Sequence, residues 1–245
     1  MSTPTSAPDF DTLEKTVEYA AERLWTALDW YWPAFGDNGI GESNAVIALI
    51  RALDDARLKR ETGIGPTEVY GESPYFRNAS ESEQKARLDL LFAVHDSRSV
   101  CLTCAVEAKR LFNTSSAESM TNDIKRLRRF ELDYIENNEE NALVAADRHY
   151  GMILGLTQHH QIPGWWSDLA IDSSPSSPPE GNESEAWIDL GKEVASALGT
   201  DGKVGHFSSA DHHPDRAERY FSGSDARTVY LLYAIFDLKR QASAS

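Results

Sequence analysis

Apolar residues recur at helical spacing in two segments near the N-terminus. Over 12–32, and again over about 42–59, apolar side chains return every three or four positions, which is the period of one helix face. The first apolar stripe is Leu13, Val17, Ala20, Leu24, Leu28 and Tyr31, and the second is Val46, Leu49, Ile50 and Leu53. The pattern predicts two helices, with a tail over 1–10 before the first and a turn over 37–41 between them.

Alternation with a period of two predicts three strands after these helices. The expected strands are 67–72, 87–94 and 99–111, and the short polar link over 95–98 joins the last two as an antiparallel hairpin. The third strand has one apolar face (Leu102, Cys104, Val106, Ala108) and one face that ends in two charges (Cys101, Thr103, Ala105, Glu107, Lys109). Burying either charge unpaired is costly, so the pair is either a functional site or a surface salt bridge at a strand end.

The rest of the chain alternates between periodic and polar segments. Expected elements are a helix over 116–135, a buried strand over 150–157, a helix over 186–198, a loop over 201–214 and an apolar element over 229–236. Residues 171–185 are rich in Ser, Pro and Glu, which is typical of a flexible linker or insertion.

The length of 245 residues predicts one domain with a sizeable core. We expect residues 1–41 to be a tail and a helix packed on a core over 42–170. Residues 186–245 would then complete the same domain beyond the linker.

The chain is acidic, with 39 Asp and Glu against 24 Lys and Arg and a net charge of −15. Such a charge argues against non-specific binding of nucleic acid, because phosphate binding draws on Lys and Arg. Any nucleic-acid role must rest on a local basic patch, a metal ion or a partner that supplies affinity. An acidic surface also suits a basic protein partner or a homo-oligomer.

Two cysteines, Cys101 and Cys104, lie three positions apart on the third expected strand. We interpret both as core thiols of a reduced, cytoplasmic protein, since a single CxxC without a second pair is a weak zinc signal. No apolar run approaches the roughly 18–20 residues of a membrane span, and the first residues do not resemble a secretory signal, so no membrane association is expected.

Acidic and basic groups that suit metal-assisted chemistry gather around the predicted hairpin. Asp89 lies in the second strand, Glu107 and Lys109 end the third, and Glu42 begins the preceding helix. Two carboxylates on facing strands repel each other unless a cation lies between them, and such oxygen ligands suit Mg²⁺ or Mn²⁺. The cation would activate a water and stabilise charge on a phosphoryl oxygen, and the lysine would orient that water or deprotonate it. For Glu42, an N-terminal acid favoured by the helix dipole is an equally open interpretation.

The segment Leu88-Asp89-Leu90-Leu91-Phe92, followed by Val106-Glu107-Ala108-Lys109, resembles the core of the PD-(D/E)XK, or restriction-endonuclease-like, nucleases. The resemblance implies an α/β fold in which an αβββαβ core forms a mixed central sheet flanked by helices. It also implies that Asp89, Glu107, the carbonyl of Ala108 and Glu42 bind the metal while Lys109 assists the water. It covers about half the chain, over 42–157, and Leu88 stands where the motif name has Pro.

The tripeptide of an acid, any residue and lysine is not specific by itself, because four more occur at 83–85, 123–125, 201–203 and 237–239. Only Glu107 has a hairpin partner strand with an aspartate, a preceding helix, and a following helix and strand. The fourth rival also ends an apolar run, but it lies too close to residue 245 for a further helix and strand to follow.

The helix over 116–135 is the most basic segment of the acidic chain. Lys125, Arg126, Arg128 and Arg129 either contact a substrate phosphate backbone or form an ordinary solvated helix face. The sequence therefore favours a Mg²⁺- or Mn²⁺-dependent endonuclease acting on DNA. By resemblance alone, its setting would be antiviral defence or DNA processing. The alternative is a non-catalytic protein-interaction subunit that retains the nuclease fold.

Overall fold

The computed structural model describes residues 9–35, 41–74, 87–95, 100–130, 146, 148–170, 178–179, 183–212 and 228–238. Most of the expected linker over 171–185, and nearly all of the expected tail over 1–10, lie outside these residues.

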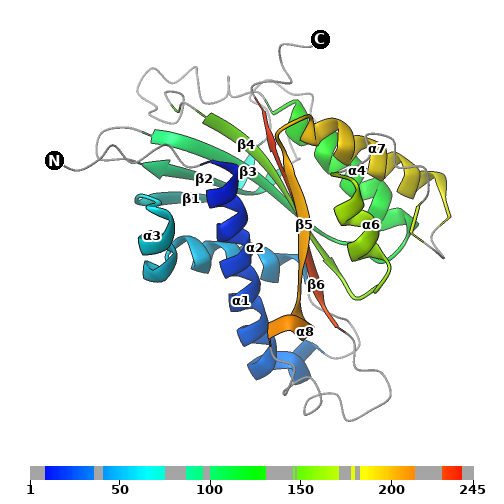
Figure 1. The fold of residues 1–245 in the computed structure, drawn as a ribbon, viewed down its shortest axis with the longest axis horizontal. Coiled ribbons are helices and arrows are strands. Elements are labelled where there is room, and N and C mark those ends of the chain that lie inside the picture. The colour runs from blue at the N-terminus through cyan, green and yellow to red at the C-terminus, as the bar shows by residue number, and fades with distance from the viewer. Residues whose placement is uncertain are drawn as a thin grey trace.

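A six-stranded mixed sheet forms the centre of the molecule, in the order β1-β2-β3-β4-β6-β5 (Figure 1). Its strands are β1 Thr67–Pro74, β2 Arg87–His95, β3 Val100–Arg110, β4 Arg148–Thr157, β5 Lys203–Ser208 and β6 Tyr230–Asp237. The strands β1, β2 and β3 are antiparallel neighbours, β4 is parallel to β3, and β6 is antiparallel to both β4 and β5. Parallel pairing of β3 with β4 requires a crossover, which α4 provides.

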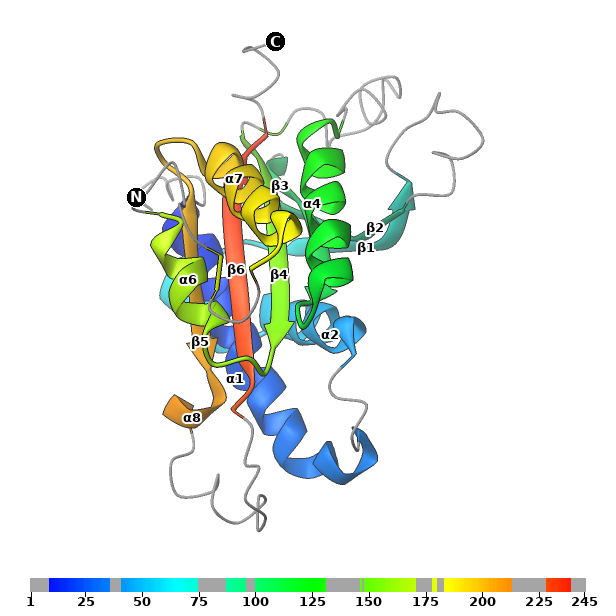
Figure 2. The same cartoon turned by 90° about the vertical axis from the view of Figure 1, so that its right-hand side faces the viewer.

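Helices cover both faces of this sheet. One face carries α1 Phe10–Phe35, α2 Glu42–Leu53 and α3 Ala56–Thr62, and the opposite face carries α4 Thr114–Arg128, α6 Ile162–Asp168 and α7 Glu185–Leu198 (Figures 1 and 2). A short helix, α8 Ser209–His212, follows β5. The expected mixed sheet flanked by helices is therefore confirmed. Within the described residues, no helix combines the length and apolarity needed to cross a membrane.

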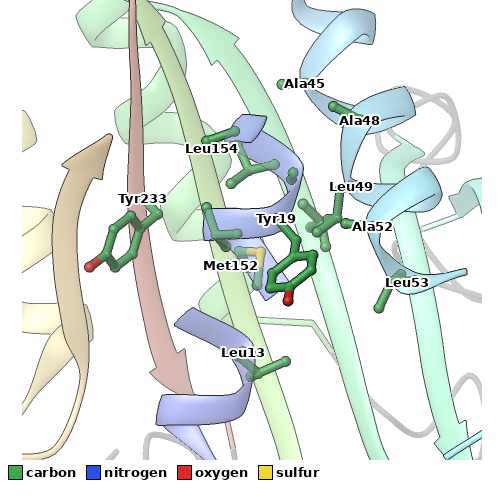
Figure 3. Packing of buried hydrophobic residues seen from close by; sticks show 14 of the residues in the cluster. Leu13, Tyr19, Ala45, Ala48, Leu49, Ala52, Leu53, Met152, Leu154 and Tyr233 are labelled. Atoms are coloured by element: carbon green, nitrogen blue, oxygen red, sulfur yellow. The ribbon is translucent and has the colours of Figure 1, made fainter. Parts of the chain in front are cut away.

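Alternation along the strands divides the apolar residues into two cores. On the face of α1 and α2, Leu13 and Tyr19 of α1 and Leu49 of α2 pack over Met152 and Leu154 of β4 (Figure 3). Small residues along the buried side of α2 (Ala45, Ala48 and Ala52) allow this helix to lie close to its neighbours.

The second core lies between the sheet and the helices α4, α6 and α7. Buried on the helices are Met120, Ile124, Leu127, Trp166, Trp187, Leu190 and Val194. Two glycines of β4 face this core, and a Cβ built on Gly151 would lie only 2.4 Å from the Phe236 ring. A Cβ on Gly155 would lie 3.1 Å from Leu232, so β4 is glycine-rich where β6 side chains cross it.

The expected helix over 42–59 is two helices, because Asp55 interrupts it. Its side chain accepts the Arg57 backbone N–H at 2.7 Å and so caps a new helix, α3. The expected apolar stripe is also rotated, since Ala45, Ala48 and Ala52 are buried while Val46 and Ile50 are only partly buried.

The expected loop over 201–214 is wrong, because residues 203–208 form the edge strand β5. Its polar residues and central Gly205 leave no regular alternation of apolar and polar residues in the sequence. The segment is a strand because it pairs with β6. Two helix ends also differ. The first helix continues past Pro33 to Phe35, and α4 ends at Arg128 rather than near residue 135.

Candidate functional site

β2 and β3 stop pairing at the position where the sequence predicts a site. Their register runs from Val94 opposite Leu102 to Leu90 opposite Val106 and ends there. β2 nevertheless continues along β1 as far as Arg87, and β3 continues along β4 as far as Arg110. The sheet therefore opens between two strands that each keep their other neighbour.

Asp89 and Glu107 occupy the first positions beyond the last β2–β3 pair. Glu107 lies on the sheet face of Ala105, which is the face that α4 covers. Asp89 lies close to it on the neighbouring strand, where alternation along β2 is irregular: Leu88 and Leu91 both join the core of α4, whereas Leu90 joins the other core. Glu107 is buried, with 4% exposure, whereas Asp89 is half-buried. The two carboxylates predicted to act together thus arise from neighbouring strands at the point where their backbone pairing ends.

Two carboxylates replace strand β2 as partners of the β3 backbone. The Ala108 N–H donates to Asp89 Oδ2 at 2.8 Å, and the Arg110 N–H donates to Glu42 Oε1 at 3.0 Å. Backbone N–H groups that lose a ladder partner require another acceptor when they are shielded from water. Asp89 and Glu42 meet this requirement at alternate β3 residues, so both carboxylates are aligned along the same opened edge.

Glu42 reaches this edge because it is the first residue of α2. Gly41 caps the helix without a side-chain hydrogen bond, and the Asn44 backbone N–H bonds to the Gly41 carbonyl at 3.0 Å. A carboxylate in the first helical turn is also favoured by the helix dipole. The two interpretations of Glu42 therefore coincide, since one residue begins the helix and contacts the predicted site.

Lys109 lies between two carboxylates from opposite faces of the sheet. Its Nζ is 3.2 Å from Asp123 Oδ2 on α4 and 3.7 Å from Glu42 Oε2 on α2. The Asp123 side chain is 2% exposed and that of Glu42 is 41% exposed. Because buried charges are screened less by solvent, Asp123 is the stronger partner of the ammonium.

The sequence interpretation did not assign a role to Asp123, which it considered only as part of a chance tripeptide in a helix. Asp123 lies three residues after Met120 and four before Leu127, so it interrupts the buried stripe of α4. Asp123 Oδ1 also accepts a hydrogen bond from Arg126 of the same helix. The signal that could have identified Asp123 in the sequence is its position as a charged residue within the apolar stripe of a predicted helix.

The candidate metal-ligating atoms at this site are all oxygens, and oxygen ligands suit a hard divalent cation. Mg²⁺ in proteins is commonly held by one or two carboxylates together with waters and substrate phosphates. Asp89 keeps Oδ1 beyond its bond to Ala108, and Glu107 comes from the neighbouring strand. By chemistry, two carboxylates and the Ala108 carbonyl are the kind of ligands that such a cation takes, and their binding of a metal stays a prediction.

The described residues do not offer a larger set of side-chain ligands for a metal ion at this site. Among the described residues, no group of three or more His, Cys, Asp or Glu side chains is arranged to hold a metal ion. Glu42 directs its oxygens at the Arg110 N–H and at Lys109. Its expected place among the metal ligands thus stays a prediction, and its contacts favour a role beside Lys109.

The four basic residues of α4 do not form a single patch. Arg126 binds Asp123, and Arg128 Nη1 lies 2.6 Å from Glu193 of α7. Lys125 and Arg129 are exposed. Those two residues, one helical turn apart, are the members of the set most available to a phosphate backbone.

Both cysteines are free and buried, as expected. Burial raises the pKa of the Cys104 thiol well above its usual range. A group that resists ionisation is a poor nucleophile and a poor metal ligand, so Cys104 belongs to the core.

Comparison of the chain with models of protein families, with curated proteins and with solved structures finds no match.

Proposed function

We propose that this chain is a metal-dependent phosphodiesterase that cleaves nucleic acid, with DNA as the expected substrate, on a restriction-endonuclease-like core. The observation that carries the proposal is the position of Asp89 and Glu107. They lie on neighbouring strands where β2 and β3 separate, Asp89 accepts the N–H of Ala108 next to Glu107, and Lys109 follows two residues after Glu107.

The order of the elements supports the proposal. From α2 onward, apart from the short helix α3, the chain forms a helix, three antiparallel strands, a crossover helix and a strand parallel to the third. The PD-(D/E)XK resemblance implies the same αβββαβ order, and the order does not depend on the site residues. The strands β6 and β5 extend the sheet beyond β4.

Each residue of the site has a distinct task in this proposal. Asp89, Glu107 and the Ala108 carbonyl would hold a Mg²⁺ or Mn²⁺ ion. When bound, that ion lowers the pKa of a water and stabilises charge on the phosphoryl oxygen. The Lys109 ammonium is a donor placed to orient the attacking water toward the phosphorus. Glu42 would keep the end of β3 in place through the Arg110 N–H.

The net charge of −15 requires that substrate binding be local. Lys125 lies on α4 and Arg129 is its C-terminal cap, and both are exposed. The same helix contributes Asp123 to the site. We assign to Lys125 and Arg129 contact with the phosphate backbone. Arg126 and Arg128 are bound to carboxylates of the protein itself and are assigned to the structure of α4.

Plasmid cleavage tests the proposal directly. Purified wild-type protein is incubated with supercoiled plasmid and with single-stranded DNA, in Mg²⁺, in Mn²⁺ and in chelator. We expect metal-dependent nicking that Glu107→Gln reduces by roughly 10²- to 10⁴-fold, which is the range for loss of a group that acts on the reacting atoms. Glu118→Gln is the matched control, since Glu118 is an exposed carboxylate of α4.

The alternative of a non-catalytic interaction subunit is favoured by the ion pairs of the basic groups. Lys109, Arg126 and Arg128 are each bound to carboxylates within the chain. An absence of cleavage, together with a melting temperature that Mg²⁺ does not change, would support this alternative and overturn the enzyme.

A further inference from the structure

We propose that Asp123 is a positioning residue that holds the Lys109 ammonium at the site, an inference that rests on the function proposed above. The contact that carries it is the 3.2 Å distance between Asp123 Oδ2 and Lys109 Nζ, made by a carboxylate that is 2% exposed.

The position of Asp123 is fixed before it meets the lysine. Asn113 caps α4 by accepting the Ser116 N–H at 2.9 Å, and Ser116 Oγ accepts the Asn113 N–H at 3.0 Å. Met120, Ile124 and Leu127 are fully buried on the same side of the helix. Both the start of α4 and its rotation are therefore set by other residues, and Asp123 is directed toward β3.

Arg126 completes this arrangement from within the helix. It binds Asp123 Oδ1, so the two oxygens of one carboxylate serve two different cations. This bond holds the plane of the carboxylate and leaves Oδ2 for Lys109. Asp123 Oδ2 is buried without a hydrogen-bond partner among the described residues, and the Lys109 ammonium lies 3.2 Å from it. Arg126 and Lys109 therefore share the charge of this carboxylate, one at each oxygen.

Packing alone does not explain an aspartate at this position. A buried ion pair is often no more stabilising than apolar residues of similar volume, and Met120, Ile124 and Leu127 on the same side of α4 are apolar. A lysine side chain without a fixed partner samples many rotamers. The acid therefore serves to select one position for the ammonium, which a catalytic donor requires.

Glu42 does not perform the same task. It approaches Lys109 only to 3.7 Å, is far more exposed, and uses its other oxygen on the Arg110 N–H. We infer a division in which Glu42 holds the strand and Asp123 holds the side chain.

A double-mutant cycle separates positioning from folding. Single-turnover cleavage and melting temperature are measured for wild type, Asp123→Asn, Lys109→Met and the double variant, with saturating metal. We expect Asp123→Asn to reduce the rate constant by roughly 10- to 100-fold with KM almost unchanged, since misplacing a catalytic group by about 1 Å costs up to 10²-fold. In the Lys109→Met background the same change should have no further effect.

Glu193→Gln is the matched control. It also replaces a largely buried carboxylate that binds an arginine of α4, but Glu193 belongs to α7 and contacts Arg128 rather than Lys109. If Asp123→Asn does not fold at the assay temperature, Asp123→Ser, which is smaller and uncharged, takes its place in the cycle.

The outcomes distinguish this inference from the function on which it rests. Cleavage by wild type with equal rates for Asp123→Asn and Glu193→Gln overturns the role of Asp123 alone. Equal losses from Asp123→Asn with and without Lys109 overturn it as well, because the effect would not pass through the lysine. Absence of cleavage by wild type overturns both proposals.

Discussion

Asp89 of β2 accepts the backbone N–H of Ala108 of β3 through its side chain, at 2.8 Å. The bond joins two strands beyond the last residues that pair through their backbones. Asp89 therefore has a structural task in addition to the proposed chemical one, and substitutions can separate the two.

Asp89→Asn should retain the structural task and lose the chemical one. The amide oxygen still accepts the Ala108 N–H, but the neutral side chain is a poorer ligand for a divalent cation. We expect a melting temperature close to wild type and a higher concentration of Mg²⁺ for half-maximal cleavage. Asp89→Ala should lose both tasks, with a free energy of unfolding lower by about 1–2 kcal/mol. Equal melting temperatures of the two variants would contradict the role of this hydrogen bond.

Glu42→Gln and Glu42→Ala form a similar pair at the other β3 N–H. Gln can still accept from Arg110, so its free energy of unfolding should stay near that of wild type, whereas Ala should lower it by about 1 kcal/mol. Urea denaturation measures both. In cleavage assays, Gln should cause a smaller loss than Asp123→Asn, because Asp123 is closer to Lys109. A larger loss would assign Glu42 to the metal shell instead.

Gly151→Ala should destabilise the protein without any direct effect on the site. A Cβ at this position would lie 2.4 Å from the Phe236 ring, so β4, β6 or the ring must move. Overpacking of this kind costs about 1–3 kcal/mol. Urea denaturation should show a lower midpoint than for Gly164→Ala, where the added Cβ meets nothing within 4 Å. Equal urea midpoints for the two variants would show that the second core can accommodate an added methyl group without loss of stability.

Cys104 should make the free energy of unfolding fall as the pH rises above about 9. Burial raises the pKa of this thiol above its ordinary value of 9.0, so the unfolded chain releases the proton while the folded protein keeps it. The unfolded state then binds fewer protons and is favoured by rising pH, with a limiting slope of about 1.4 kcal/mol per pH unit for one group.

The measurement is urea denaturation between pH 8 and about 9.5, where ordinary tyrosines, with a pKa of about 10, are still mostly protonated. Cys104→Ala should be less stable at pH 8, because it leaves a small cavity, but should show a shallower fall. The same slope in both proteins would assign the pH dependence to other groups.

The strands around the site could be predicted because their alternation is local. Leu90, Phe92 and Val94 specify one side of β2, and the short link after them requires a hairpin. That hairpin brings Asp89 close to the end of β3 without any knowledge of the helices. Alternation does not extend to Leu88, which joins the core of α4 instead.

Contacts between residues far apart in the sequence could not be predicted from the pattern of apolar and polar residues. Asp123 meets Lys109 only because α4 crosses back over β3, and β5 is a strand only because β6 lies beside it. The division of α2 from α3 depends on a single cap at Asp55, which outweighs a continuous helical pattern. Tertiary partners and side-chain caps decide these cases.

The position of β6 has a consequence for the order in which the protein can be built. β6 lies inside the sheet between β4 and β5, yet it is the last strand along the chain. Helix α1, near the N-terminus, also relies on it, since Tyr233 of β6 donates a hydrogen bond to Glu14 across 219 positions of sequence. During synthesis, β5 therefore lacks its neighbouring strand, and α1 lacks its contact with Tyr233, until β6 leaves the ribosome. The strands β2 and β3, which carry the proposed site, are synthesised well before β6. The residues of the site can therefore come together before the sheet is complete.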